Sequence, residues 1–262
     1  HAFQHAGDAP GMKLESLLQY VDDYLGVAGH PDYPTALNGL QVAGPADVTR
    51  IATAVDASLA TIERAAEAGA QLLMVHHGLF WSGLRPVVGR RYRRLKSLFD
   101  HDMALYACHL PLDGHAEIGN CVLLARAIGL EPAGRFGSYG GAELGWWGTL
   151  EEPVEPSALV ARVAASVGGE VRHLPGGPDR VHRVGVLTGG GGSFVREAAE
   201  LELDAFVTGE GAHHTFFDAE EFGIHVLFGG HYATETFGIR ALGEHLAERF
   251  GLDSVYIDRP TG

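Results

Sequence analysis

Five side chains in this sequence have the types and spacing that two closely placed divalent metal ions require: His76, His77, Asp113, His231 and Glu235. Together they supply three imidazoles and two carboxylates, a set that suits zinc, manganese, iron or nickel and does not choose among them. His231 and Glu235 are four residues apart, so on a helix both side chains lie on one face, about one turn apart. A bridging carboxylate such as Glu235 can hold two ions at roughly 3.5–4 Å and let them share a water molecule.

Each candidate ligand stands where an expected structural element ends. His76 and His77 follow an apolar strand, and neighbouring strand residues point to opposite faces, so adjacent ligands converge only where the strand ends and the chain turns. Gly78 permits such a turn. Asp113 closes another apolar strand that runs into a Pro-containing loop. Open α/β sheets place their binding sites at strand ends. A single His-x-x-x-Glu pair would be weak evidence for a metal site, but the shared placement of all the candidate ligands at such ends indicates one.

Five motifs, in this order, resemble the NIF-three-like family, whose members are also named GTP cyclohydrolase 1 type 2 homologues. They are Asn38-Gly-Leu-Gln-Val42, His76-His-Gly78, His109-Leu-Pro-Leu-Asp113, Thr208-Gly-Glu210 and Gly230-His-Tyr-Ala-Thr-Glu235. The resemblance runs from about Met12 to Arg259. It implies two metal ions per chain on the five ligands above, two intertwined α/β lobes and a ring-shaped homohexamer. It also implies a reaction that opens the guanine imidazole ring of GTP and releases formate.

Composition and charge exclude several classes of protein. The chain has 262 residues, 46% of them hydrophobic, enough for one large or two modest domains, and no run approaches the roughly 20 apolar residues of a membrane span. The net charge of −14 argues against general nucleic-acid binding. Cys108 and Cys121 do not suggest a disulfide framework, and residues 1–11 resemble a disordered extension and not a signal peptide. We therefore expect a soluble, cytoplasmic protein.

The alternation of strand and helix patterns predicts a three-layer α/β fold. A strand over 50–55, a helix over 58–68 and a strand over 71–75 recur 133 residues later, which indicates an internal β-α-β duplication or a coincidence of two common units. Because His231 and Glu235 must meet His76, the C-terminal section, with a helix over 233–250, is expected to return to the first lobe. The predicted lobes are residues 12–130 with 225–262, which hold the metal site, and residues 131–224. The segment 134–148 is expected to contain the crossing.

Further residues near these ligands are candidates for proton transfer and substrate contact. His109 lies four residues before Asp113 and is an additional ligand, a residue that orients one, or a proton shuttle. Glu210 occupies the repeat position of His77 and is a general base or a partner of a ligand. His213 and His214 follow it and are candidates for substrate contact.

Two other segments each have two interpretations. The four glycines from Gly189 to Gly192 form either a tight turn or a nest of backbone amides that holds an anion. Residues 90–96 contain five of the 19 basic residues and form either a solvated helix face or a patch that steers a phosphorylated substrate toward the metals.

The leading interpretation is a dinuclear metal-dependent hydrolase of a nucleotide-like or other phosphorylated small molecule. Metal binding lowers the pKa of water and yields hydroxide at neutral pH, with His109 or Glu210 as the group that transfers protons. The alternative is a non-catalytic metal-binding or regulatory protein that acts through protein partners, because fold and family do not establish chemistry.

Overall fold

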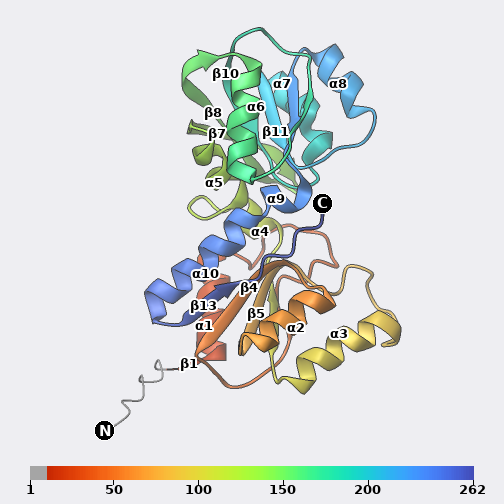
Figure 1. Ribbon diagram of the computed structural model, residues 1–262, viewed down its shortest axis with the longest axis vertical. Coiled ribbons are helices and arrows are strands. Elements are labelled where there is room, and N and C mark those ends of the chain that lie inside the picture. The colour runs from red at the N-terminus through yellow and green to blue at the C-terminus, as the bar shows by residue number, and fades with distance from the viewer. Residues whose placement is uncertain (1–10) are drawn as a thin grey trace. The chain divides into compact units, whose positions relative to one another are not determined.

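The computed structural model describes residues 11–262 as two compact units, between which the chain passes more than once (Figure 1). The first unit contains the chain up to Gly29, Tyr33–His109 and Ile239–Arg259. The second contains His30–Asp32, Leu110–Gly238 and Pro260–Gly262. Both units combine strands and helices, so the predicted α/β class with two intertwined lobes is confirmed. Residues 1–10, which belong to the expected extension, lie outside the described part.

The first unit is built on a five-stranded sheet with the strand order β13-β4-β5-β6-β2. Strands β13, β4, β5 and β6 are parallel, and β2 pairs antiparallel to β6. In chain order the elements are β1 (Met12–Lys13), α1 (Leu14–Leu25), β2 (Gly39–Val42), β3 (Asp47–Val48), β4 (Arg50–Asp56), α2 (Leu59–Glu67), β5 (Leu72–His77), α3 (Gly89–Asp100), β6 (Ala104–Ala107), most of α10 (Thr236–Phe250) and β13 (Asp253–Tyr256). Strands β1 and β3 form a separate antiparallel pair.

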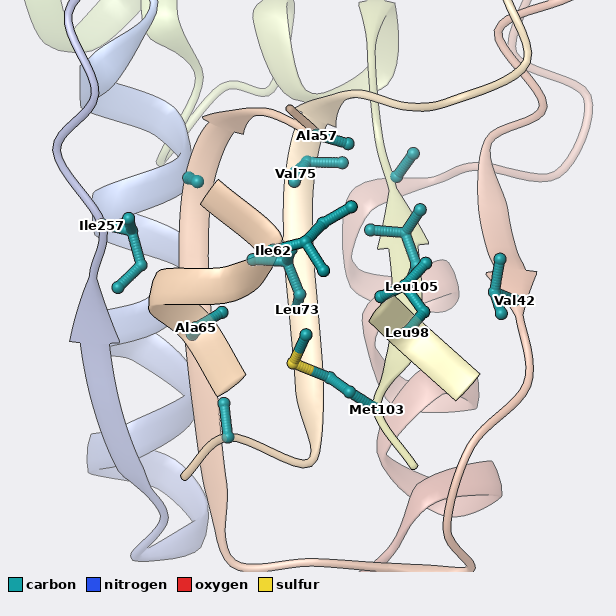
Figure 2. Packing of buried hydrophobic residues seen from close by; sticks show 14 residues of the cluster. Val42, Ala57, Ile62, Ala65, Leu73, Val75, Leu98, Met103, Leu105 and Ile257 are labelled. Atoms are coloured by element: carbon teal, nitrogen blue, oxygen red, sulfur yellow. The ribbon is translucent and has the colours of Figure 1, made fainter. Parts of the chain in front are cut away.

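Helices cover both faces of this sheet. On one face, Ile62 of α2 and Leu98 of α3 pack against Leu73 of β5 and Leu105 of β6, as Figure 2 shows. On the other face, the Tyr106 hydroxyl of β6 donates a 2.7 Å hydrogen bond to Asp22 of α1. Helix α10 lies on that face too, because a Cβ at Gly243 would be only 3.0 Å from the Thr53 methyl group. The predicted three layers are therefore present in this unit.

The second unit has a six-stranded sheet with the order β7-β8-β10-β11-β12-β9. Its central strands β10, β11 and β12 are parallel, and the flanking pairs are antiparallel. In chain order the elements are α4 (Leu110–Asp113), α5 (Asn120–Ala127), β7 (Leu130–Tyr139), β8 (Ala142–Val154), α6 (Pro156–Val167), β9 (Arg172–Leu174), β10 (Val181–Val186), the 3-10 helix η1 (Gly191–Phe194), α7 (Val195–Glu200), β11 (Ala205–Thr208), α8 (Thr215–Phe222), β12 (His225–Phe228) and α9 (His231–Thr234).

This sheet is also covered on both faces, which is why its parallel strands carry buried apolar residues on both sides. Phe206 of β11 packs in one cluster with residues of α7 and α8. Its neighbours Ala205 and Val207 point the other way, into a cluster with residues of α5 and α6. The second unit is therefore three-layered as well.

The two predicted β-α-β units make equivalent hydrogen bonds 133 residues apart. Gln71 Oε1 accepts from the backbone N–H groups of Thr49 and Arg50, at 3.0 and 2.9 Å. Asp204 Oδ2 accepts from those of His182 and Arg183, both at 2.8 Å. In each unit the arginine then donates to a carbonyl at the end of the helix, that of Ala68 or Leu201. These bonds support the internal duplication, which stays a prediction.

The structure divides the chain elsewhere than the sequence analysis predicts. Helix α5 belongs to the second unit and not the first, because its apolar residues Leu124 and Ala125 pack with the second sheet. Strand β12 pairs with β11, so residues 225–238 also belong to the second unit. Segment 134–148 is not a crossing, because it lies within the antiparallel pair of β7 and β8.

The C-terminal section does return to the first unit, but only from Ile239 onward. The helix predicted over 233–250 is interrupted: α9 ends at Thr234 and α10 begins at Thr236. Within residues 11–262, none of the helices has the length and apolar character needed to cross a membrane. Cys108 and Cys121 are both buried, and neither forms a disulfide within the described residues.

Candidate metal centre

Three imidazoles lie together at one edge of the first unit's sheet. His76 and His77 end β5, and His109 follows β6, the parallel neighbour of β5. One ligand nitrogen from each of the three lies within 4.8 Å of the others. The ring centroids of His76 and His77 are 4.6 Å apart, and those of His76 and His109 are 5.2 Å apart. Two neighbouring strand residues therefore converge where the strand ends, as predicted.

Hydrogen bonds fix the tautomer of two of these rings. His76 Nδ1 lies 2.9 Å from the carbonyl oxygen of Cys108, and His77 Nδ1 lies 2.8 Å from Asp56 Oδ1. A carbonyl or carboxylate oxygen can only accept, so each Nδ1 carries the hydrogen and each Nε2 carries the lone pair that binds a metal. Carboxylate and carbonyl partners of this kind orient metal-binding histidines and raise their basicity.

Asp56 is a further candidate site residue, which the motifs of the sequence did not point to. It is the last residue of β4 and lies directly opposite His77 in the parallel register of β4 and β5. The signal was present in the sequence, because Asp56 closes the apolar strand that precedes the His76-His77 strand. Carboxyl ends of adjacent parallel strands meet at one edge, so an acidic residue there is a candidate partner for the histidines.

The Asn38–Val42 motif holds the segments that carry the histidines. Asn38 Oδ1 accepts a 2.8 Å hydrogen bond from the backbone N–H of His109. Gln41 Oε1 accepts one of 2.9 Å from the N–H of Leu79. A Cβ at Gly78 would lie only 2.3 Å from the Gln41 side chain. Gly78 therefore leaves room for the Gln41 amide, a role beyond the turn expected from the sequence.

In the second unit, Asp113 is a buried carboxylate held by neutral donors. It ends the short helix α4 and does not lie in a loop as the sequence suggested. The residue is only 5% exposed. Its Oδ1 accepts hydrogen bonds from Asn120 Nδ2 at 2.9 Å and from the Thr188 hydroxyl at 3.2 Å. These two neutral donors fix the position of the buried carboxylate.

His231 lies between two carboxylates of the second unit. Its Nε2 is 3.1 Å from Glu235 Oε2, and its Nδ1 is 2.6 Å from Glu210 Oε1. The contact with Glu235, followed by that with Glu210, outweighs burial and raises the pKa of His231 to about 9. The four-residue spacing thus brings His231 and Glu235 together as predicted, although Glu235 lies just beyond α9. Glu210 contacts the candidate ligand His231 directly, which fits a partner that orients it.

The Gly189 backbone makes room for the Glu235 carboxylate. A Cβ at Gly189 would lie 2.1 Å from Glu235 Oε1, and the residue has a φ of +71° that favours glycine. The amides of this loop already donate to the chain: Gly189 to Thr234 Oγ1, Gly191 to Thr208 Oγ1 and Gly192 to the Glu210 carbonyl. Three of the four glycine amides are thus bonded within the chain, which favours the tight turn over the anion nest.

The two other histidines considered make contacts within their own helix region. The His213 ring packs edge-on against Phe217, with centroids 5.8 Å apart. His214 Nε2 lies 3.9 Å from Asp218 Oδ2. Both side chains are exposed. Their contact with substrate stays a prediction.

The residues present fit divalent metal ions. The first unit offers three converging imidazoles, two of them with Nε2 set as the lone-pair nitrogen. The second offers two buried carboxylates, Asp113 and Glu235, and an imidazole between acidic groups. Nitrogen and oxygen donors of this kind suit zinc and neighbouring first-row metals. Groups positioned to bind a metal are therefore present in both units.

Comparisons with known proteins agree on one family. Residues 12–261 match the family model described as Duf34/NIF3 (NGG1p interacting factor 3). A protein of Halobacterium salinarum named GTP cyclohydrolase 1 type 2 homolog is 45% identical over 256 residues, which cover 96% of this chain and 100% of that protein. A homolog of the same name from Deinococcus radiodurans is 40% identical over 248 residues, covering 95% and 94% of the two chains.

Solved structures show the same fold. TTHA1606 from Thermus thermophilus superposes with a TM-score of 0.86 at 39% identity, covering 96% of this chain and 100% of that one. Reduced HcgD from Methanocaldococcus jannaschii superposes with a TM-score of 0.83 at 25% identity, with 96% and 100% covered. The similarity extends over nearly the whole of each chain.

Proposed function

The chain belongs to the Duf34/NIF3 family, and we propose that it is a dinuclear metal-dependent hydrolase of a nucleotide-like or other phosphorylated small molecule. The observation that carries this proposal is the preset donor state of His76 and His77, whose Nδ1 atoms are hydrogen-bonded to Cys108 and Asp56. One ring nitrogen from each of His76, His77 and His109 also lies within 4.8 Å of the others, a clustering that filling a core does not require.

The proposed ligands are His76, His77, Asp113, His231 and Glu235, for two divalent ions per chain. When bound, such ions lower the pKa of a water molecule to near neutrality, which supplies hydroxide for hydrolysis. A ring nitrogen of His109 lies within 4.8 Å of one from His76 and one from His77. His109 is therefore proposed as a further ligand or a proton-transfer group. Glu210 is proposed as the residue that positions His231 through the 2.6 Å bond to Nδ1.

GTP is the first substrate to test, because the relatives are named GTP cyclohydrolase 1 type 2 homologs. Two buried cysteines that form no disulfide within the described residues fit a reducing compartment, and we propose the cytoplasm as the location of the protein. The homohexamer is also proposed, on the family resemblance.

A metal analysis tests the centre itself. Protein purified without chelator is expected to approach two ions per chain, and Glu235→Ala to lose at least one. His182→Ala is a matched control, because His182 contributes only its backbone N–H to the contacts described here. Full metal occupancy in the His76→Ala, Glu235→Ala double variant would contradict the ligand assignment.

A hydrolysis screen tests the reaction. Metal-reconstituted protein should hydrolyse GTP or a member of a panel of nucleotides and phosphoesters. Asp113→Asn should keep the fold but reduce turnover steeply, because a neutral amide is a poorer ligand than a carboxylate. Hydrolysis that is absent from the wild type across the panel would overturn the enzyme proposal.

One observation favours a second candidate function. The family description itself refers to an interacting factor, a protein named for a partner. A non-catalytic metal-binding or regulatory protein would show the metal occupancy without any hydrolysis. Partner binding that is unchanged in Asp113→Asn would then support that role.

A further inference from the structure

A small cavity in the first unit is surrounded by arginines. Its lining consists of Leu79 and Ser82, from the loop that follows β5, and of Arg90, Arg91 and Arg94, from α3. Its volume is about 50 Å³. One water molecule needs roughly 10–15 Å³ measured in this way, so the cavity has room for a group of several non-hydrogen atoms.

The charges of two of these arginines are not balanced by the chain. Arg91 is accounted for, because it donates to the carbonyls of Gly83 and Arg85 and lies over the Phe80 ring. The side chains of Arg90 and Arg94 form no ion pair or hydrogen bond with any residue from 11 to 262. Burial, followed by the positive charge of Arg90, lowers the pKa of Arg94. The chain has 33 acidic and 19 basic residues, so two neighbouring arginine side chains without an acidic partner are a specific local feature.

The start of α3 adds to the positive potential at the same place. The helix begins at Gly89, and its N-cap residue is Val88, whose side chain makes no capping hydrogen bond. The N–H groups at the first turn of a helix are left without helical acceptors and favour an anion. Arg90 and Arg91 belong to this first turn, so side chains and backbone act together.

We propose that the cavity lined by Ser82, Arg90, Arg91 and Arg94 binds a phosphate group. Several guanidinium groups around one small space match the tetrahedral oxygens and double negative charge of a phosphate better than a single carboxylate does. The volume admits the phosphate and not a whole nucleotide, so the remainder of a ligand would lie outside the cavity. The strongly acidic chain disfavours a nucleic-acid backbone as the source of that phosphate.

The loop between β5 and α3 joins this cavity to the histidine cluster of the same unit. Leu79 follows His77 by two residues. Trp81, between the lining residues Leu79 and Ser82, has its ring centroid 4.9 Å from that of His109 and 6.2 Å from that of His77. The phosphate is therefore assigned to the substrate, a step that rests on the proposed hydrolase function. It is held beside the metal-binding histidines and does not take part in the reaction.

Calorimetric titration of the full, metal-stripped chain with inorganic phosphate tests the site without any catalysis. We expect saturable binding that Arg94→Gln and Arg90→Gln each weaken by about tenfold, because each removes one charge-assisted contact. Arg93→Gln is the matched control: Arg93 is on the same helix, is exposed and does not line the cavity. It changes the net charge equally and should change the affinity less than about twofold, because an exposed charge outside the cavity is screened by solvent and does not contact the phosphate.

Two results would overturn the site: no saturable phosphate binding by the wild type, or an equal loss of affinity in Arg93→Gln, which would indicate only diffuse attraction. Far-ultraviolet circular dichroism on each variant checks that the fold is kept. At the same concentration, phosphate should also raise the midpoint of thermal unfolding of the wild type and of Arg93→Gln by more than that of Arg94→Gln.

A second measurement separates this proposal from the hydrolase proposal. With a substrate that the reconstituted enzyme turns over, Arg94→Gln should raise KM and leave kcat nearly unchanged, because the phosphate is bound in ground and transition states alike. A KM that is unchanged in Arg94→Gln would refute the substrate assignment even if hydrolysis is real. Specific phosphate binding without hydrolysis of any compound would uphold the site and contradict the hydrolase.

Discussion

We expect Asp56 to set the metal affinity of the histidine cluster through His77, and graded substitutions can measure how much. Its Oδ1 accepts the hydrogen of His77 Nδ1 at 2.8 Å, with the Asp56 and His77 side chains 34% and 19% exposed. Asp56→Asn keeps an oxygen that can accept this hydrogen but removes the negative charge. Asp56→Ala removes both and leaves the ring free to rotate or change tautomer.

The expected losses follow from that difference. Removal of a residue that orients a metal-binding histidine costs about 10–100-fold in affinity. We place Asp56→Asn near the lower limit, about tenfold or ~1.4 kcal/mol, because the acceptor remains and the pair is partly screened by water. Asp56→Ala should approach the upper limit, about 100-fold or ~2.7 kcal/mol.

Competition of the metal-stripped protein with a chromophoric chelator for zinc measures these affinities. Asp47→Asn is the control, because Asp47 forms an exposed ion pair with Lys13 and changes the net charge equally. Three outcomes would refute the reasoning: an unchanged affinity in Asp56→Ala, a greater loss in Asp56→Asn than in Asp56→Ala, or a similar loss in Asp47→Asn.

Three further predictions concern the second unit and the assembly. The pKa of His231 is raised from 6.5 to about 9 in the metal-free protein. The contribution of this residue to stability should therefore be complete below pH 6.5 and disappear as the pH rises through about 9. Denaturant unfolding across this pH range measures that dependence, which Glu235→Gln should flatten. Gly189→Ala should lower the metal content by displacing Glu235, because the added carbon would lie 2.1 Å from Oε1. The control Gly168→Ala has the same φ of +71° but nothing within 4 Å of the added carbon, so it should lose only stability. Equal metal content in both variants would contradict this prediction. Light scattering should give six times the 27.9 kDa chain mass, and a monomer mass at micromolar concentrations would exclude the hexamer.

The apolar patterns of the sequence determined the α/β class and most of the elements. The helix expected over 58–68 is α2 (Leu59–Glu67), and the strand expected over 50–55 is β4 (Arg50–Asp56). Local patterns succeed here because each element has a continuous apolar run or one buried face. The His231 and Glu235 spacing likewise determined their contact, since four residues make about one helical turn.

Tertiary packing alone decided which sheet each element joined and which partners the ligands received. Helix α5 lies before the predicted boundary at residue 130, yet it packs on the second sheet. The apolar face of an amphipathic helix shows that the helix is packed against something, but not which of two sheets it covers. The same limit concealed Asp56, which meets His77 only through the register of two strands. It also concealed the need for Gly78 and Gly189, because neither the Gln41 amide beside the first nor the Glu235 carboxylate beside the second is a neighbour in sequence. Sequence determines the chemistry that a residue offers, whereas the distances that make it a site arise from long-range pairing and packing.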